Sequence, residues 1–168
     1  MRFLCDAMLG GIAKWLRAAG HDTRSASEDS DTSDRALVRL AIREDRALLT
    51  SDGGFLERGP VRDGEIAFLL VPQAPIEEQL LLVVRRFGLG RHAPRCMRCN
   101  GALEELPREA AEQHVPPKVA ERQEEFFRCQ RCGQLFWYGT HWERIGGRLE
   151  RVFGQVPASS DVVSEGSC

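Results

Sequence analysis

The chain lacks any apolar run long enough to cross a membrane. A transmembrane helix needs roughly 20 consecutive apolar residues, and no stretch of the 168-residue sequence approaches that length. The N-terminal segment MRFLCD leads directly into a predicted strand, so we expect no signal peptide. These absences predict a cytoplasmic protein that does not associate with a membrane.

The chain also lacks a strong charge of either sign. Its formal net charge is -2 at pH 7, so binding to nucleic acid would have to depend on a local basic patch rather than on the field of the whole molecule. The hydrophobic content of 42% and the charged content of 29% are typical of folded globular proteins and argue against wholesale disorder. A chain of this length has room for one ordinary domain and one small module.

The chain has six cysteines, and four of the six form two Cys-x-x-Cys pairs: Cys96 with Cys99, and Cys129 with Cys132. In a protein without an export signal, such pairs are typical of metal or redox sites rather than of a disulfide framework. Each pair places two thiolates on one tight turn, so the two turns together supply the four ligands of a tetrahedral zinc ion. Because four thiolates leave no open coordination position, we expect a structural zinc. A redox dithiol and unliganded cysteines are the alternatives.

The first half of the chain alternates apolar runs with amphipathic helical patterns. The pattern predicts strands at 3–5, 21–26, 47–50 and 66–71, and helices at 9–19, after Ser33 and at 76–87. Gly20 and Gly88 supply C-terminal stops for the first and the last of these helices. This order of elements predicts an α/β domain in which helices cover a mainly parallel sheet.

The pattern changes near residue 89, which divides the chain into four parts. We expect an α/β domain at 1–88, a basic linker at 89–95, a zinc-ribbon module at 96–153 and a disordered tail at 154–168. Within the module, the sequence predicts a polar helical segment at 108–114 and a short aromatic strand after the second cysteine pair.

Aromatic side chains and one histidine gather around the second cysteine pair: Phe127, Phe136, Trp137, Tyr138, His141 and Trp142. These side chains could stack on nucleic-acid bases, or they could form the core of the module. We favour core packing, because a module this small has few other apolar residues.

Three aspartates stand where a parallel sheet would bring them to one edge. Asp6 and Asp52 each follow a predicted strand, and Asp34 lies in the first turn of the second helix. Converging carboxylates repel one another unless a cation lies between them, and their oxygens are the ligands that magnesium or manganese prefers. Such a site could hydrolyse a phosphodiester bond. Each aspartate could instead be an ordinary turn or helix-capping residue, and Asp29 and Asp31 compete for the third position.

Basic residues offer possible phosphate contacts in two places. Lys14 and Arg17 lie three positions apart on the first predicted helix and could approach the same edge as the aspartates. A second group extends from the last helix of the α/β domain to the cysteine pairs: Arg85, Arg86, Arg91, Arg95, Arg98, Arg128 and Arg131. This second group could follow an RNA backbone, although both groups could also be ordinary solvated charges.

Six segments together carry a family resemblance: RFLCDAMLGGIAKWLRAAGHD, LLTSD, EEQL, CMRCNG, CQRCG and FWYGTHW. With these segments the chain resembles the PIN-like ribonuclease domain named after the C-terminal region of the Mut-seven exonuclease, in its prokaryotic form with an appended zinc ribbon. The resemblance implies a three-layer PIN-like fold and a magnesium- or manganese-dependent ribonuclease acting on single-stranded RNA. It implies Asp6, Asp34 and Asp52 as the acids, with Lys14 and Arg17 at the basic helix positions.

One departure from the family pattern supports an alternative function. The family has an arginine inside its Leu-Thr-Arg-Asp segment, whereas this chain has Ser51 at that position. One phosphate contact is therefore missing. The alternative is a catalytically inactive RNA- or protein-binding module of the same fold.

Overall fold

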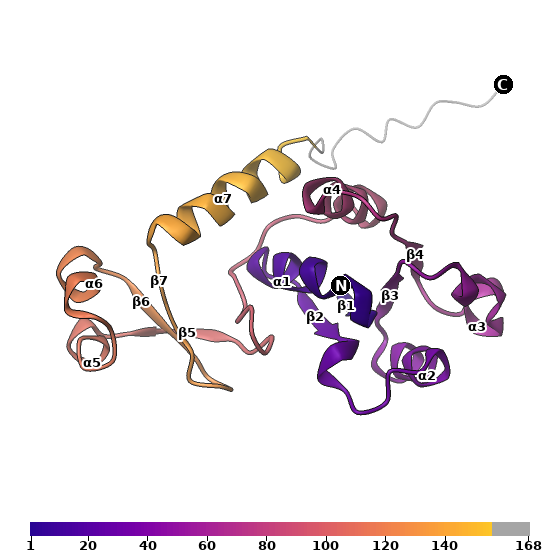
Figure 1. Ribbon diagram of the computed structural model, residues 1–168, viewed down its shortest axis with the longest axis horizontal. Helices are drawn as coiled ribbons and strands as arrows, with labels where there is room; N and C mark the ends of the chain where they lie inside the picture. Colours follow the sequence, from indigo (N-terminus) through magenta and orange to yellow (C-terminus); the bar gives the residue numbers. More distant parts are fainter. Residues whose placement is uncertain (156–168) are drawn as a thin grey trace, which may run out of the picture.

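The computed structural model describes residues 1–155 of the chain. Apart from its first two residues, the tail that we expected at 154–168 lies outside the described residues. The chain forms an α/β unit and a smaller unit with a sheet of its own, and a long C-terminal helix passes between the two (Figure 1). None of the described helices is long and apolar enough to cross a membrane.

A four-stranded parallel sheet forms the centre of the α/β unit. Its strands are β1 (Arg2–Cys5), β2 (Asp22–Ser25), β3 (Ala47–Thr50) and β4 (Phe68–Leu70). They lie in the order β2-β1-β3-β4, and every neighbouring pair is parallel, as the sequence predicts. The two central strands, β1 and β3, are the most apolar and the most buried, as expected of strands with helices on both faces.

Four helices cover the two faces of this sheet: α1 (Gly10–Ala18), α2 (Asp34–Glu44), α3 (Gly59–Arg62) and α4 (Ile76–Phe87). Side chains alternate along β1, so Phe3 and Cys5 pack with α1 and α4, whereas Leu4 packs with α2 and α3. This arrangement confirms the three-layer fold. Helix α3 was not predicted, because its four-residue GPVR segment is too short to show a helical period.

The ends of the helices follow the sequence signals closely. The hydroxyl of Ser33 accepts a hydrogen bond from the backbone of Ala36 and caps α2. Gly88 ends α4 in a left-handed conformation with φ of 59°. Ile42 on α2 does not join the core, because this side chain is 48% exposed.

The smaller unit, here called the cysteine module (residues 96–139), contains a three-stranded antiparallel sheet. Its strands β5 (Leu103–Leu106), β6 (Phe126–Cys129) and β7 (Leu135–Trp137) lie in sequence order. Two short helices, α5 (Arg108–Ala111) and α6 (Pro117–Arg122), belong to the connection between β5 and β6. Side chains from this connection pack on one face of the sheet around Ala111, Val115 and Phe126. The sequence predicted α5 and β7 but not β5, β6 or α6.

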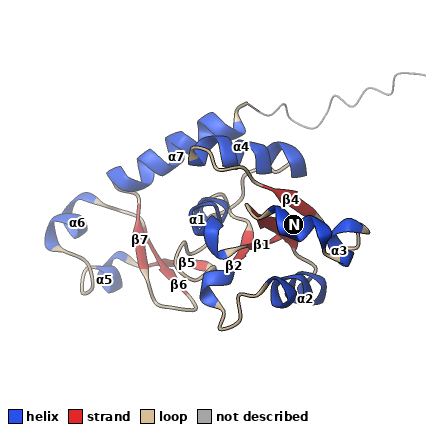
Figure 2. Ribbon diagram, turned by 45° about the vertical axis from the view of Figure 1, so that its right-hand side comes forward, coloured by secondary structure: helices blue, strands red, loops and turns tan. Residues whose placement is uncertain are grey.

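The final helix, α7 (Thr140–Phe153), returns to the α/β unit and lies alongside α4 (Figure 2). Its side chains Ile145, Leu149 and Val152 are buried in the same core cluster as the inner faces of α1 and α4. Exposed Glu77 at the start of α4 pairs with two arginines of α7. The end of the segment that we expected to belong to the zinc-ribbon module, 96–153, therefore completes the core of the α/β unit.

The segment that we expected to be a linker, residues 89–95, is bound to the C-terminal end of α1. The backbone of His92 donates to the carbonyl of Ala19 at 2.9 Å, and that of Arg95 donates to the carbonyl of Arg17 at 2.9 Å. Gly20 adopts a φ of +95°, and a Cβ atom there would lie only 2.6 Å from the Cβ of His92. Glycine at position 20 therefore allows the close contact that fixes this segment.

We predict that Leu149→Ala lowers the free energy of unfolding of the α/β unit by about 2–5 kcal/mol, because it opens a cavity in the shared core. The matched control is Leu82→Ala on α4, where the side chain is 36% exposed and the expected loss is below about 1 kcal/mol. Urea unfolding followed by circular dichroism measures both values. Equal losses in the two variants would mean that α7 does not contribute to this core.

Candidate functional site

At the C-terminal edge of the parallel sheet, the hydroxyl of Thr50 links the side chain of Asp6 to the backbone of Asp52. Strand β1 ends one residue before Asp6, and β3 ends at Thr50, so both aspartates follow neighbouring strands. The buried Thr50 Oγ1 donates to Asp6 Oδ2 at 2.8 Å and accepts from the backbone nitrogen of Asp52 at 3.0 Å. One side chain therefore sets the position of a carboxylate and of the turn that carries the second carboxylate.

Each of these two aspartates also caps the turn that follows it. Asp6 accepts from the backbone of Ala7, at the start of the 3-10 helix Ala7–Leu9. Asp52 Oδ1 accepts from the backbone of Gly54 at 2.8 Å. Within the described part of the chain, Asp52 Oδ2 accepts no hydrogen bond, and Asp52 is exposed. This oxygen is available for a ligand.

Asp34, the third predicted acid, is held in an ion pair. Its Oδ2 lies 2.7 Å from Nη2 of Arg58, which follows the turn begun by Asp52. The two competitors for the third position are also occupied, because Asp29 pairs with Arg24 and Asp31 accepts from the backbone of Ser33. Among residues 1–155, the three predicted acids do not form a group with all ligand atoms within 4.8 Å of one another.

Arg17, which we expected to contact substrate, lies in the interior with only 2% of its surface exposed. Its guanidinium donates to the carbonyls of Thr23, Met97 and Arg98 at 2.8 to 3.2 Å, and to the carboxylate of Glu28 at 2.7 Å. These partners belong to β2, to the turn after β2 and to the first cysteine pair. We therefore correct the expected role: Arg17 joins the α/β unit to the cysteine module.

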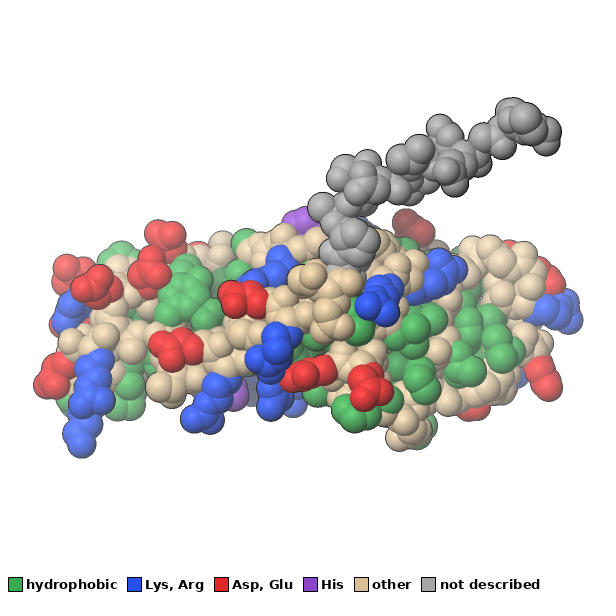
Figure 3. Space-filling view, turned by 90° about the horizontal axis from the view of Figure 1, so that it is seen from above, with side chains coloured by type: hydrophobic (Ala, Val, Ile, Leu, Met, Phe, Trp, Pro, Cys, Tyr) green, Lys and Arg blue, Asp and Glu red, His purple; other side chains and the backbone are tan. Residues whose placement is uncertain are grey.

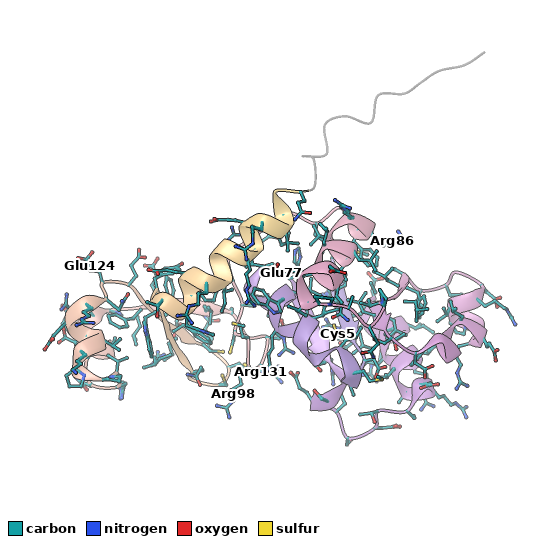
Figure 4. The ribbon with its side chains drawn as sticks, turned by 45° about the horizontal axis from the view of Figure 1, so that its top comes forward. Cys5, Glu77, Arg86, Arg98, Glu124 and Arg131 are labelled. Carbon is teal, nitrogen blue, oxygen red and sulfur yellow. The ribbon has the colours of Figure 1, made fainter. Side chains whose placement is uncertain are left out.

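The remaining basic residues do not form one continuous strip. Lys14 is exposed on α1. Arg98 and Arg131 lie together beside the cysteine sulfurs, far from Arg86 on α4 (Figure 4). The other four expected members are Arg85, exposed near the end of α4; Arg91, paired with Glu150; Arg95, bonded to Asn100; and Arg128, paired with Glu104.

The four paired cysteines converge as the sequence predicts. Their sulfur atoms all lie within 4.8 Å of one another, with 3.6 Å between Cys96 and Cys132 and 3.4 Å between Cys99 and Cys129. A tetrahedral zinc ion with bonds of about 2.3 Å would separate its sulfur ligands by about 3.8 Å. The cluster could therefore hold a metal ion of this kind with small adjustments.

The backbone around the cluster is shaped for thiolates. Residues with positive φ, Asn100 at 64° and Gly133 at 71°, follow the two cysteine pairs and let each turn close. A Cβ atom at Gly101 would lie 2.7 Å from the sulfur of Cys129, so only glycine fits there. Although burial raises the pKa of the Cys129 thiol, N–H groups of its own turn and the neighbouring thiols lower it to about 7. The second turn therefore favours a thiolate at Cys129, whereas burial raises the pKa of Cys96 to about 12 and also raises the pKa of Cys99. A metal ion would have to displace the protons of these two thiols.

Asn100 attaches the first cysteine turn to the edge strand β2. Its side-chain oxygen accepts from the backbone of Thr23 at 3.1 Å, and its nitrogen donates to Asp22 at 2.7 Å. Arg46 also donates to Asp22, at 2.8 Å. Sequence reasoning missed the roles of Asn100 and Thr50. The signal at Thr50 was a hydroxyl at the end of an otherwise apolar strand, and at Asn100 it was a residue that tolerates positive φ directly after a cysteine pair.

A family model described as Mut7-C RNAse domain matches residues 1–149. The chain belongs to the Mut7-C RNAse domain family. This match confirms the family resemblance and extends over both the carboxylate edge and the cysteine module. Membership of the Mut7-C family supports ribonuclease activity and RNA as the substrate. No curated protein and no solved structure matches the chain.

In this Mut7-C domain, we predict that Arg17→Met lowers the free energy of unfolding by about 2–4 kcal/mol, because it leaves buried carbonyls without a donor. Lys14→Met on the same helix is the matched control and should change stability by less than about 0.5 kcal/mol. Denaturant unfolding of both variants measures the difference. If Lys14→Met were as destabilising as Arg17→Met, the buried hydrogen bonds of Arg17 would not explain the loss.

We also predict one tightly bound metal ion per Mut7-C chain, which Cys99→Ser should release because it removes one of four ligands. Elemental analysis of the purified protein gives the metal-to-chain ratio. Cys5→Ala is the control and should retain the ion, since Cys5 is buried in the core of the α/β unit. A metal-free chain with a disulfide among the four paired cysteines would instead support a redox dithiol.

Proposed function

We propose that this chain is a metal-dependent ribonuclease that hydrolyses RNA phosphodiester bonds at the edge formed by Asp6 and Asp52. The observation that carries the proposal is the convergence of both residues on the hydroxyl of Thr50, in a chain that belongs to a ribonuclease family. This edge holds the carboxyl ends of parallel strands, where ligands of open α/β sheets bind.

The side chains at this edge suit a hard divalent cation. Magnesium or manganese bound there would supply Lewis-acid activation for phosphodiester hydrolysis. The role of Thr50 is to hold Asp6 Oδ2 in a fixed orientation, while Asp52 keeps one oxygen open. We include Asp34 as the third acid, because its ion pair with Arg58 is partly exposed and therefore weak enough to exchange for a cation.

The proposal assigns different tasks to the remaining charged and metal-binding groups. Exposed Lys14 is the proposed phosphate contact on α1, whereas buried Arg17 has no part in substrate binding. Once released from Asp34, Arg58 would face the same edge. It could then replace the arginine that the family has at the position of Ser51. The four cysteines hold a structural zinc, which keeps the module folded and takes no part in the chemistry.

Ser51 and the ion pair of Asp34 favour a second candidate function. Without the family's arginine, and with one of three acids neutralised by Arg58, the chain would bind RNA or a protein without cleaving RNA. This candidate keeps the same fold and the same structural zinc.

We predict that Asp6→Asn lowers the rate of cleavage of single-stranded RNA by about 100-fold or more, the scale expected for loss of one catalytic group. The assay uses labelled RNA with magnesium or manganese, and EDTA should stop the reaction. Asp45→Asn is a matched control, because Asp45 ends α2 in a left-handed conformation that asparagine also adopts. Its activity should equal that of the wild type.

Two further variants in this assay examine the geometry of the site. Thr50→Ser keeps the hydroxyl and should retain cleavage, whereas Thr50→Val removes it and should lower kcat with little change in KM. The second candidate would be supported if the wild type were as inactive as Asp6→Asn across a panel of single-stranded RNAs, and if both proteins bound RNA in a salt-dependent way.

A further inference from the structure

An open pocket lined by aromatic side chains lies on the face of the small sheet opposite α5 and α6. Phe127 on β6 stands directly across from Phe136 on β7, so both side chains project from the same face. The cavity has a volume of about 170 Å³. Its lining comes from the sheet, the segment before the first cysteine and the start of α7: Ala93, Pro94, Leu103, Phe127, Phe136, Trp137, Tyr138 and Trp142.

From the sequence we expected the aromatic side chains to form the core of the cysteine module, and only some of them do so. Trp137 packs against the small core around Phe126, beneath the sheet. In contrast, Phe127, Phe136 and Trp142 are half-buried around the cavity, and Tyr138 is 40% exposed. Seen from the side of α4 and α7, hydrophobic side chains are visible at the surface in several places, one of them near the start of α7 (Figure 3). The pocket is therefore accessible to a ligand from solution.

Neighbouring aromatic rings of the pocket meet edge to face. The ring centroids of Phe127 and Tyr138 lie 5.4 Å apart with planes at 84°, and those of Tyr138 and Trp142 lie 6.0 Å apart at 65°. Neighbouring walls of the pocket are thus steeply inclined to each other. A planar ring of the size of a nucleobase can stack on one wall and meet the edge of the next.

Charged residues of both signs lie close in the chain or in the sheet to residues that line the pocket. Exposed Arg91 lies two residues before Ala93 and has only a long ion pair, at 3.8 Å, with Glu150. Exposed Glu105 stands across from Phe127 on the same face of the sheet. A phosphate backbone would be attracted by Arg91 and repelled by Glu105, so we expect the aromatic rings, rather than the charge, to hold the strand at the pocket.

The pocket is fixed in place relative to the carboxylate edge. Residues 93–94 follow the bond from His92 to the end of α1, and α7 packs on α4. Helix α1 has nine residues, which corresponds to a length of about 14 Å, and Asp6 lies beyond its other end, before the 3-10 helix Ala7–Leu9. Lys14 is exposed between the two ends. A single strand of several nucleotides could therefore contact both sites along this helix.

We propose that this pocket binds one nucleobase of a single-stranded RNA by stacking, several nucleotides away from the bond cleaved at Asp6 and Asp52. The inference rests on the proposed ribonuclease function for the choice of RNA as the ligand. Aromatic stacking accepts any base, because every base has a π face, so the pocket grips the strand without selecting a sequence. Its fixed distance from the carboxylates would position the strand for cleavage.

The test measures RNA affinity in the Asp6→Asn background, where cleavage does not interfere. Fluorescence anisotropy of a labelled single-stranded RNA decamer gives Kd. We predict that Tyr138→Ala raises Kd about tenfold, as expected for the loss of one stacked base, whereas Tyr138→Phe retains the parental Kd. Ile42→Ala, at a side chain 48% exposed on α2, is the control and should bind as the parent does.

A decamer without bases separates stacking from backbone binding. Parent and Tyr138→Ala should bind this abasic strand equally, and Trp142→Leu provides a second test should Tyr138→Ala misfold. The proposal would be overturned if both pocket variants bound RNA with the parental Kd, or if they lost as much affinity for the abasic strand as for RNA. The pocket would then be a candidate site for a protein segment. If the wild type cleaves RNA but both pocket variants bind RNA as the parent does, only the proposal for the pocket is contradicted. If the pocket variants bind RNA more weakly but the wild type does not cleave it, only the proposed ribonuclease function is contradicted.

Discussion

The buried guanidinium of Arg17 is the interaction on which the arrangement of the two units depends. A buried charge is costly unless hydrogen bonds replace its hydration, and Arg17 obtains these bonds from β2, from Glu28 and from two carbonyls of the first cysteine turn. Neither unit alone supplies the full set. The α/β unit is therefore complete only when the cysteine turn is folded against it.

This dependence gives the cysteine cluster an influence beyond its own module. A metal ion on the four sulfurs would fix the turn that presents the carbonyls of Met97 and Arg98 to Arg17, and the same turn carries Asn100 to the free edge of β2. Helix α1 lies between this interface and Asp6. The structural metal site and the proposed catalytic edge are thus connected through one helix, although they share no residue.

Local patterns in the sequence predicted the elements that local forces determine. The parallel strands, the cap at Ser33 and the stop at Gly88 all follow from short-range signals, as does the cysteine cluster. Arg17 could not be predicted in the same way, because it lies three positions from exposed Lys14 and its burial depends on carbonyls about 80 residues later. Helix α7 was missed because Gly146 and Gly147 interrupt its pattern, and its buried side chains find their partners only in the α/β unit.

At the carboxylate edge, the sequence predicted three acids together, whereas the structure pairs Asp34 with Arg58 and links the side chain of Asp6 to the backbone of Asp52 through Thr50. Three nearby carboxylates repel one another when no cation balances their charge. In the structure, the guanidinium of Arg58 neutralises Asp34, and the hydroxyl of Thr50 donates a hydrogen bond to Asp6. In the proposed ribonuclease, a cation that attracts Asp34 would release Arg58 beside the position where the family carries its arginine and this chain carries Ser51. Arg58 would then serve the substrate phosphate, so the same residue that keeps the acids apart without a cation would support catalysis with one.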